Sequence, residues 1–155
     1  MHATPDILFK RLEDLGIATE NHNHCPVFTV EEAQTHCAHL PGGHCKNLFL
    51  KDKKGRFWLV VAQEDSTVNL KILRQTIGAA ELSFGKPELL LTVLGIKPGS
   101  VTPFSVINDT DLQVTVILDA SLLKSAMLNF HPLINTSTTS VTPNGLIKFL
   151  NATNH

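Results

Sequence analysis

Apolar residues recur at helical spacing in several separated parts of this chain. In residues 5–15 leucines repeat every three or four positions, Thr4 and Pro5 supply an N-cap and a first-turn proline, and Gly16 can end the helix. The same signals predict four further helices, over residues 29–36, 70–77, 87–94 and 142–149, and a short helical segment over 121–126.

Shorter apolar runs between these segments predict strands. Residues 47–50 and 57–62 flank the polar, glycine-bearing stretch 51–56, which is typical of a hairpin. Further strands are expected over residues 81–84, 112–118 and 127–131, and the alternation of apolar and polar residues in 112–118 favours a sheet edge. We therefore expect one mixed α/β (α+β) domain that spans residues 1–155.

One cation lies inside an apolar strand, at Lys46. Because side chains of a strand alternate between faces, Lys46 shares a face with Leu48 and Leu50, and Asn47 shares the other face with Phe49. An ammonium on such a face must reach water, be neutralised or bind an anion. A solvated head is the simpler interpretation, but two glycines just upstream would let a phosphate or carboxylate approach the backbone closely.

Composition narrows the functional classes. The 155 residues are 43% hydrophobic and 17% charged, and no apolar run approaches the roughly 20 residues that span a bilayer. The N-terminal segment lacks the apolar region of an export signal. The three cysteines do not have the spacing of a disulfide framework, which fits a reducing compartment. We therefore expect a cytoplasmic protein without a membrane partner. A formal net charge of -1 disfavours bulk electrostatic binding to DNA or RNA, so any RNA contact should be local.

Histidine and cysteine are concentrated between His22 and Cys45. Structural zinc sites usually pair their ligands as Cys-x-x-Cys and His-x-x-x-His, and neither spacing occurs here. His36 and His39 could meet on one helix face, but surface or packed histidines are the favoured interpretation. No metal is expected.

Nucleophilic catalysis by cysteine or serine has little support in the sequence. Cys45 lies beside His44 and Lys46, yet adjacent strand residues face opposite sides, so neither side chain could readily reach the sulfur. No G-x-S-x-G elbow is present, and Ser100 lies in a loop, residues 98–104, that two prolines and a glycine keep from forming a regular helix.

Four stretches in this order carry a more specific signal: PVFTVEEA at residues 26–33, HCKNLFL at 44–50, GSVTPF at 99–104 and LNFHPL at 128–133. Together they resemble the YbaK/ProX family of aminoacyl-tRNA editing proteins, and most closely its freestanding ProXp-ala (PrdX) branch. The resemblance extends from about residue 4 to residue 149.

The resemblance implies a fold and a set of site residues. The family's fold is a mixed, barrel-like sheet surrounded by helices. Its lysine corresponds to Lys46, the neighbouring asparagine to Asn47, and its histidine to His131. Its G-x-x-x-P loop corresponds to Gly99, Ser100, Val101, Thr102 and Pro103. We expect Lys46, Gly99, Ser100 and His131 to serve catalysis, and Asn47 and the rest of the loop to bind substrate.

The implied activity is hydrolysis that removes a wrong amino acid, in first place alanine, from mischarged tRNA for proline, with prolyl-tRNA synthetase as a further expected partner. An aminoacyl ester is already activated, so a positioned water, donors for the oxyanion and a fixed 3′ adenosine suffice without a cofactor. Lys46 would hold the terminal adenosine phosphate, and the amides of the 99–103 loop would hold the aminoacyl carbonyl. The ribose hydroxyl would orient the water, and His131 would shape the pocket or hydrogen-bond the substrate.

Selectivity would follow from size. Each methylene is worth about 1–3 kcal/mol, so a synthetase pocket built for proline cannot strongly reject alanine, whereas an editing pocket that admits a methyl group can exclude the larger ring. Six basic residues could bind phosphates of the acceptor stem, although each of them could equally well be a solvated surface charge. They are Lys51, Lys53, Lys54, Arg56, Lys71 and Arg74.

Two alternatives stay open at this point. One is a deacylase of the same fold that removes cysteine, serine or threonine, because the sequence fixes the pocket volume poorly. The other is a non-catalytic module that binds tRNA or protein. The intact motif residues count against the second.

Overall fold

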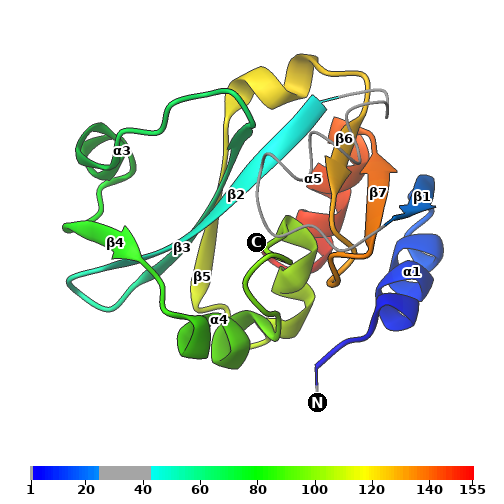
Figure 1. The fold of residues 1–155 in the computed structure, drawn as a ribbon, viewed down its shortest axis with the longest axis horizontal. Coiled ribbons are helices and arrows are strands. Elements are labelled where there is room, and N and C mark those ends of the chain that lie inside the picture. The colour runs from blue at the N-terminus through cyan, green and yellow to red at the C-terminus, as the bar shows by residue number, and fades with distance from the viewer. Residues whose placement is uncertain (1, 25–42) are drawn as a thin grey trace.

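Seven strands form one mixed sheet in the computed structural model, which describes residues 2–24 and 43–155 (Figure 1). The elements in chain order are α1 (Pro5–Asp14), β1 (Thr19–Asn23), β2 (Gly43–Asp52), β3 (Phe57–Gln63), α3 (Leu70–Ile77), β4 (Leu82–Phe84), α4 (Pro87–Leu94), the 3-10 helix η1 (Pro103–Asn108), β5 (Val114–Leu118), the 3-10 helix η2 (Ala120–Lys124), β6 (Leu128–Phe130), β7 (Ser137–Val141) and α5 (Pro143–Ala152). The predicted mixed α/β class is confirmed.

The strand order is β1-β7-β6-β2-β3-β5, and β4 pairs with β2 off this path. Two pairings are parallel, β2 with β6 and β3 with β5, and the others are antiparallel. β5 lies at the end of the strand order, as the alternating pattern of residues 112–118 predicted. Figure 1 shows β4 and β6 near opposite ends of the long β2.

Two apolar clusters cover the two faces of β2 and β3. The main core joins one face to α1, α4 and α5, and it contains Phe49, Leu59 and Phe149. A smaller cluster on the other face contains Leu50 and packs against α3. Phe49 and Leu50 therefore point to opposite sides, and Leu48 packs with Leu50, which confirms the predicted alternation.

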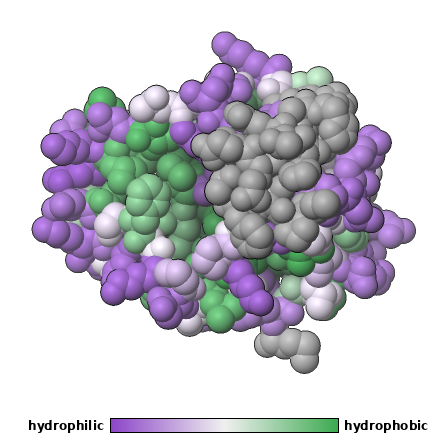
Figure 2. Space-filling model, viewed as in Figure 1, coloured by the Kyte–Doolittle hydropathy of each residue, from purple (hydrophilic) through white to green (hydrophobic). Residues whose placement is uncertain are grey.

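The smaller cluster is less completely covered than the main core. Its helix α3 has no buried residue, although Leu73 and Ile77 pack against the cluster. Phe84 of β4 is 64% exposed. Figure 2 shows apolar side chains gathered on the viewed face between α3 and β4.

The β1–β7–β6 part of the sheet has a polar interior. Four consecutive residues of β7, Ser137 to Ser140, are buried. Their hydroxyls find partners on the neighbouring strands: Thr139 Oγ1 donates to Asn21 Oδ1 at 2.9 Å, and Ser140 Oγ donates to Asn129 Oδ1 at 2.5 Å. Side-chain hydrogen bonds thus take the place that apolar contacts hold elsewhere in the sheet.

Several sequence expectations differ from the structure. β1 and β7 were not expected, and the segment near 121–126 is the 3-10 helix η2. The strand expected over residues 112–118 begins only at Val114. The carboxylate of Asp109 accepts hydrogen bonds from the backbone N–H groups of Gln113 and Val114, at 3.0 and 2.9 Å. Leu112 adopts a left-handed φ of 56°, which a strand does not allow. The helix expected over residues 29–36 lies outside the described residues.

The stops predicted for α3 and α4 are confirmed, whereas α5, expected to end at Phe149, continues to Ala152. Thr4 caps α1 by accepting the N–H of Ile7, and Gly78 and Gly95 end α3 and α4 in the left-handed conformation. Within residues 2–24 and 43–155, no helix has the length and apolarity needed to cross a membrane.

Candidate functional site

β2 carries an interruption in its pairing at the position of the predicted site. On the side away from β3, Gly43 and His44 pair with β6, and residues 50–52 pair with β4. Between them, residues 45–49 have no strand partner on that side in the described part of the chain. We call this stretch the edge gap. Side chains from both faces of the sheet are accessible from such a break.

Lys46 lies in the edge gap and is half-buried. Its Nζ donates to the carbonyl of Ser66, in the turn closed by the hydrogen bond from Ser66 N–H to Gln63 O at 3.0 Å. Its side chain is on the face of Leu48 and the smaller cluster. The ammonium is therefore held at a neutral acceptor, which a phosphate could replace.

Asn47 projects from the other face of β2, where Phe49 enters the main core. Its Oδ1 is buried and has no hydrogen-bond partner in the described part of the chain. A buried amide oxygen without a partner is costly, so this atom is suited to accept a donor from a ligand or a water.

A group of polar side chains surrounds the start of β2, on the face to which Lys46 points; they come from β2, β6 and β7 and from the positions that directly follow β1 and β6. We call it the polar face, and it consists of His24, His44, Lys46, Asn129, His131, Thr138 and Ser140. Thr138 Oγ1 lies 2.8 Å from His24 Nε2, and the rings of His24 and His131 lie 6.3 Å apart. The predicted residues Lys46 and His131 thus belong to one surface.

His131 is held as a neutral ring with one defined acceptor. Its Nδ1 lies 3.0 Å from the carbonyl of Ser137, which can only accept, so Nδ1 carries the proton and Nε2 has the lone pair. Burial lowers the pKa of His131, the hydrogen bond to Ser137 works in the opposite direction, and the charge of His24 lowers the pKa further. A neutral imidazole can accept a proton or a hydrogen bond from water.

The loop of residues 99–103 is rigidly anchored. Gly99 has a φ of 90°, a left-handed value that favours glycine. Thr102 is fully buried and caps η1 by accepting the N–H of Phe104 at 3.3 Å. The backbone N–H groups of Val101 and Thr102 donate to no group among the residues that the structure describes. Two adjacent unused donors can stabilise a carbonyl oxygen that gains charge.

The loop and His131 come from adjacent parts of the fold, whereas the loop and Lys46 do not make direct contact. Phe104, which follows the loop, packs edge-on against Phe130, which precedes His131, with 5.8 Å between ring centroids. Val101 packs against the main core, on the face opposite Lys46. No hydrogen bond joins the loop to Lys46 or His131 within residues 2–24 and 43–155.

Cys45 is unsuited to act as a nucleophile. Burial raises the pKa of its thiol to about 12, a hydrogen bond with the Asn129 backbone works in the opposite direction, and the nearby charge of Glu64 raises the pKa further. The thiol therefore stays protonated at neutral pH. This agrees with the interpretation that the sequence favoured.

The basic residues of the hairpin tip are partly committed to structure. Arg56 Nε donates to the buried carboxylate of Asp52 at 2.9 Å, and Lys53 pairs with Glu81 at 2.9 Å. Burial works to raise the pKa of Asp52, but hydrogen bonds from the Arg56 and Ala80 backbones and the Arg56 side chain and charge outweigh it and lower the pKa to about 2. Asp52 thus organises the tip.

The structure adds residues that the sequence did not single out. Asn129, Thr138 and Ser140 lie on the polar face, and none of them was predicted to contribute to the site. The sequence signal was weak, because a run of serine and threonine reads equally well as a loop. Only its position before the Thr142-Pro143 helix start hinted at an ordered strand.

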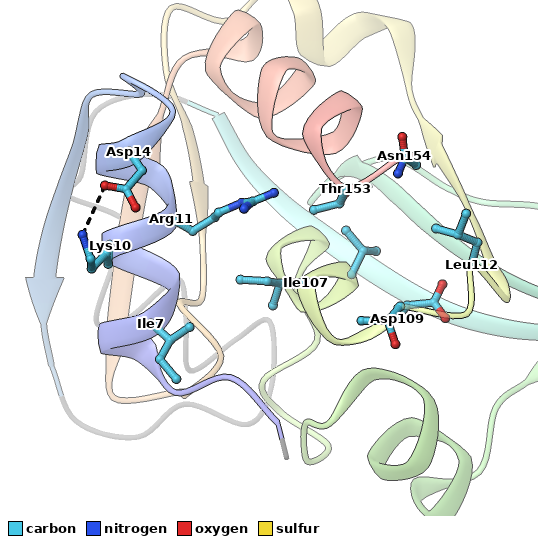
Figure 3. Close-up of a pocket in the computed structure, with 11 residues that line it drawn as sticks. Ile7, Lys10, Arg11, Asp14, Ile107, Asp109, Leu112, Thr153 and Asn154 are labelled. Atoms are coloured by element: carbon cyan, nitrogen blue, oxygen red, sulfur yellow. Dashed lines mark hydrogen bonds and ion pairs between the residues drawn. The ribbon is translucent and has the colours of Figure 1, made fainter.

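Neither a metal cluster nor a surface cavity gives a competing site among the residues that the structure describes. No group of three or more His, Cys, Asp or Glu side chains there could hold a metal ion, and Cys25, His36, Cys37 and His39 lie outside them. Figure 3 shows an open cavity of about 540 Å³ between α1, η1 and the end of α5. It contains none of the predicted site residues.

Comparisons with known proteins bear on this site. The profile of the aminoacyl-tRNA editing domain family matches residues 24–149. The prolyl-tRNA synthetase associated domain-containing protein 1 of Danio rerio is 40% identical over 157 residues, which cover 97% of this chain and 85% of that protein. The prolyl-tRNA editing protein ProX of Acetoanaerobium sticklandii is 36% identical over 143 residues, covering 92% of this chain and 87% of that protein.

A solved structure has the same fold. It is described as a candidate trans-editing enzyme for prolyl tRNA synthetase and aligns with a TM-score of 0.74 at 18% identity, over 97% of this chain and 94% of that chain. The resemblance seen in the sequence motifs is thereby confirmed at the level of the family. The chain belongs to the aminoacyl-tRNA editing domain family, whose enzymes are deacylases.

Proposed function

We propose that this protein hydrolyses the ester of mischarged tRNA for proline, with alanyl-tRNA(Pro) as its main substrate. The observation that carries the proposal is the edge gap of the sheet, which has the half-buried Lys46 ammonium on one face of β2 and the unpartnered Oδ1 of Asn47 on the other. The family match and the names of the relatives, a prolyl-tRNA editing protein among them, support the choice of tRNA.

Lys46 anchors the 3′ end of the tRNA in this proposal. Its ammonium now bonds a neutral carbonyl, that of Ser66, and the phosphate of the terminal adenosine is a stronger, charged acceptor. Anchoring one end of the substrate fixes the position of the ester relative to the protein. Such positioning contributes much of the rate in reactions whose substrate is already activated.

Donors for the developing oxyanion come from the loop of residues 99–103. The unused N–H groups of Val101 and Thr102 are the candidates, and the strained φ of Gly99 and the buried Thr102 keep them in place. Ser100 and Pro103 hold the loop's shape, because both are buried. No nucleophilic side chain takes part, in keeping with the protonated Cys45 thiol.

Water attacks the ester carbonyl, and His131 helps to orient it. The neutral ring offers Nε2 as an acceptor for the water or for the free hydroxyl of the terminal ribose, while its Nδ1–H is held by Ser137. Water adds to the carbonyl carbon, the bond from this carbon to the ribose oxygen breaks, and the ribose oxygen takes up a proton. Alanine and intact tRNA are released.

Contacts with the acceptor stem would involve the cations of the hairpin tip and α3. Lys51, Lys54, Lys71 and Arg74 are exposed, whereas Lys53 and Arg56 already have carboxylate partners. The four exposed cations form no close ion pair among the described residues and are therefore the better candidates for phosphate contacts. We further propose that residues 1–155 act as one cytoplasmic editing domain, with prolyl-tRNA synthetase as a partner.

Release of alanine from alanyl-tRNA(Pro) tests the proposal, with wild type compared with Lys46→Ala. We expect wild type to deacylate this substrate faster than prolyl-, cysteinyl-, seryl- or threonyl-tRNA, and Lys46→Ala to lose at least about 100-fold in kcat/KM, because a positioning charge is removed. Lys46→Arg serves as the matched control that keeps the charge.

Two outcomes would redirect this proposal. Faster release of cysteine, serine or threonine would assign a different amino acid to the same site. Retained tRNA binding without release of any amino acid would indicate a non-catalytic module.

A further inference from the structure

We propose that the backbone of Asn47, at the edge gap of β2, binds the aminoacyl group of the substrate as one strand residue binds another. The Asn47 C=O accepts from the substrate's amine, and the Asn47 N–H donates to its ester carbonyl. This binding mode rests on the proposed deacylase function and adds to it the group that recognises the amine.

The pairing of β2 with β3 fixes the direction of its backbone groups. Asp52 N–H donates to Arg56 O at 3.0 Å, and Glu64 N–H donates to His44 O at 2.9 Å, both in the antiparallel register of the two strands. Hydrogen-bonded and non-hydrogen-bonded pairs alternate in such a ladder. The even-numbered residues of β2 therefore direct their N–H and C=O groups toward β3, and the odd-numbered residues direct theirs away from it.

Phe49 confirms this direction, because its C=O accepts the N–H of Gly85, which follows β4, at 2.9 Å. Cys45 is next to the β6 pairing, with Asn129 beside it. Asn47 lies between these two positions, so both of its backbone groups face the edge gap. No strand pairs with them in the described part of the chain.

Three hydrogen-bonding groups of one residue thus converge on the edge gap or beside it: the N–H, the C=O and the buried, unpartnered Oδ1. Native structures pair almost all such groups, with protein, water or ligand. The family's substrate supplies suitable partners, because an aminoacyl ester carries a donor amine and an acceptor carbonyl on either side of one Cα. This is the same sequence of atoms that a strand residue presents in a hydrogen-bonded antiparallel pair.

This binding mode contributes to the discrimination against proline. The free amine of a prolyl ester keeps an N–H, but its ring replaces one hydrogen of a primary amine by a carbon and fixes the direction of what remains, so a strand edge that binds the amine disfavours proline. Correctly charged prolyl-tRNA would be disfavoured at the amine as well as by the size of its side chain. The contribution of side-chain size can be separated from that of the amine, because N-methylalanine has the methyl side chain of alanine and a secondary amine like that of proline.

The first test uses the wild-type protein and tRNA(Pro) carrying four acyl groups: alanyl, N-methylalanyl, 2-aminobutyryl and propionyl. Each kcat/KM is divided by the spontaneous hydrolysis rate of the same ester. We expect the N-methylalanyl and propionyl esters to fall at least about tenfold below alanyl, since each disturbs a hydrogen bond of the amine. The 2-aminobutyryl ester, an isomer of N-methylalanyl with a primary amine, is the size control and should exceed it.

The outcomes of this test separate the two proposals. Equal turnover of the alanyl, N-methylalanyl and propionyl esters would overturn the binding mode and leave the deacylase function standing. Hydrolysis of none of the esters would overturn the proposed function and the binding mode with it.

The second test replaces the backbone amide of Asn47 by an ester, which removes its N–H and weakens the Lys46 C=O as an acceptor. We expect alanyl-tRNA(Pro) turnover to fall about tenfold while the thermal unfolding midpoint stays close to that of wild type, because the N–H faces away from β3. The same replacement at Phe84 is the matched control. In the β2–β4 register Lys53 N–H donates to Glu81 O at 3.1 Å, so the Phe84 amide points away from β2 and turnover should be unchanged. An unchanged rate for the Asn47 ester would overturn the binding mode.

Discussion

The β2–β3–β5 half of the sheet and the β1–β7–β6 half are built by different interactions. In the first, large apolar side chains such as Leu59 and Leu50 fill both faces. In the second, four of the five buried positions of β7 are serine or threonine, and hydroxyls among them bond to side chains of β1 and β6. β7 is buried along its whole length, and its interior is lined mainly by polar groups.

This difference shows where the fold obtains its stability and where it keeps its chemistry. Burial of apolar area is favourable without any directional requirement. A buried polar network contributes little net free energy, yet it fixes the positions of groups such as Asn129 and His131. The candidate site lies where the two halves meet, at β2, where Lys46 adjoins the polar face and Leu48 the smaller apolar cluster.

The largest effect on stability is expected from Leu59→Ala in the apolar half. Leu59 is fully buried in the main core, so its truncation removes apolar contacts and leaves a cavity. We expect a loss of about 2–5 kcal/mol in the free energy of unfolding, measured by urea denaturation. Activity per folded molecule should change little. A loss below about 1 kcal/mol would mean that this half is not the main source of stability.

A smaller loss is expected from Gly85→Ala at the margin of the apolar half. An added Cβ would lie 2.4 Å from Cδ2 of Phe49, whose buried ring stacks on Phe57 at 5.5 Å between centroids. Overpacking of this kind costs about 1–3 kcal/mol. Ser83→Ala, at an exposed position of the preceding strand β4, removes only a long hydrogen bond from Ser83 Oγ to Lys51 O, 3.5 Å, and should leave the unfolding midpoint nearly unchanged. Equal midpoints for the two variants would contradict close packing at Gly85.

For Ser140→Ala we expect a smaller loss of stability than for Leu59→Ala but a larger loss of activity. It removes the 2.5 Å hydrogen bond to Asn129 Oδ1, with an expected cost of about 1–2 kcal/mol in stability. Because Asn129 lies on the polar face, deacylation should fall more for Ser140→Ala than for Leu59→Ala, at a temperature where both are folded. Ser140→Thr keeps a hydroxyl and is the control. Normal activity in Ser140→Ala would remove Asn129 from the site.

The smallest effect is a change with pH that depends on His131. Burial lowers its pKa below the usual 6.5, so the neutral form should persist as pH falls through this value. We expect deacylation, corrected for spontaneous hydrolysis, to stay level from pH 8 to about 6.5 and to decline only below it. The unfolded chain takes up this proton first, so stability also falls as pH drops below 6.5. His131→Gln should lack the decline, and an inflection above pH 6.5 would contradict the assignment.

The apolar half was largely predictable from the sequence, and the polar half was not. Runs such as residues 57–62 and the glycines at 78 and 95 predicted strands and helix ends correctly, because both signals are local. β1 and β7 were missed because neither has apolar alternation. They are strands because they pair with each other, and the register of Thr19 with Val141 joins segments far apart in the chain.

For the candidate site, the motifs selected Lys46, Asn47 and His131, and alternation placed the first two on opposite faces of β2. The basic tip shows the limit of this reasoning. Lys53 and Arg56 looked equivalent to their neighbours in the sequence, but the fold brings Glu81 and Asp52 to them. The Arg56–Asp52 pair forms within the hairpin itself, whereas the Lys53–Glu81 pair joins residues far apart in the chain, and composition reports neither.

The sequence by itself determined α1, α3, α4, α5 and the apolar strands, the faces of β2 and the family, because periodicity, turn residues and motif order are properties of neighbouring positions. The tertiary structure alone decided that β6 and β4 pair with the two ends of β2 and leave Asn47 between them. Strand pairing is fixed by backbone hydrogen bonds between segments that are distant in the chain, and such bonds leave no local pattern in the amino acids that make them.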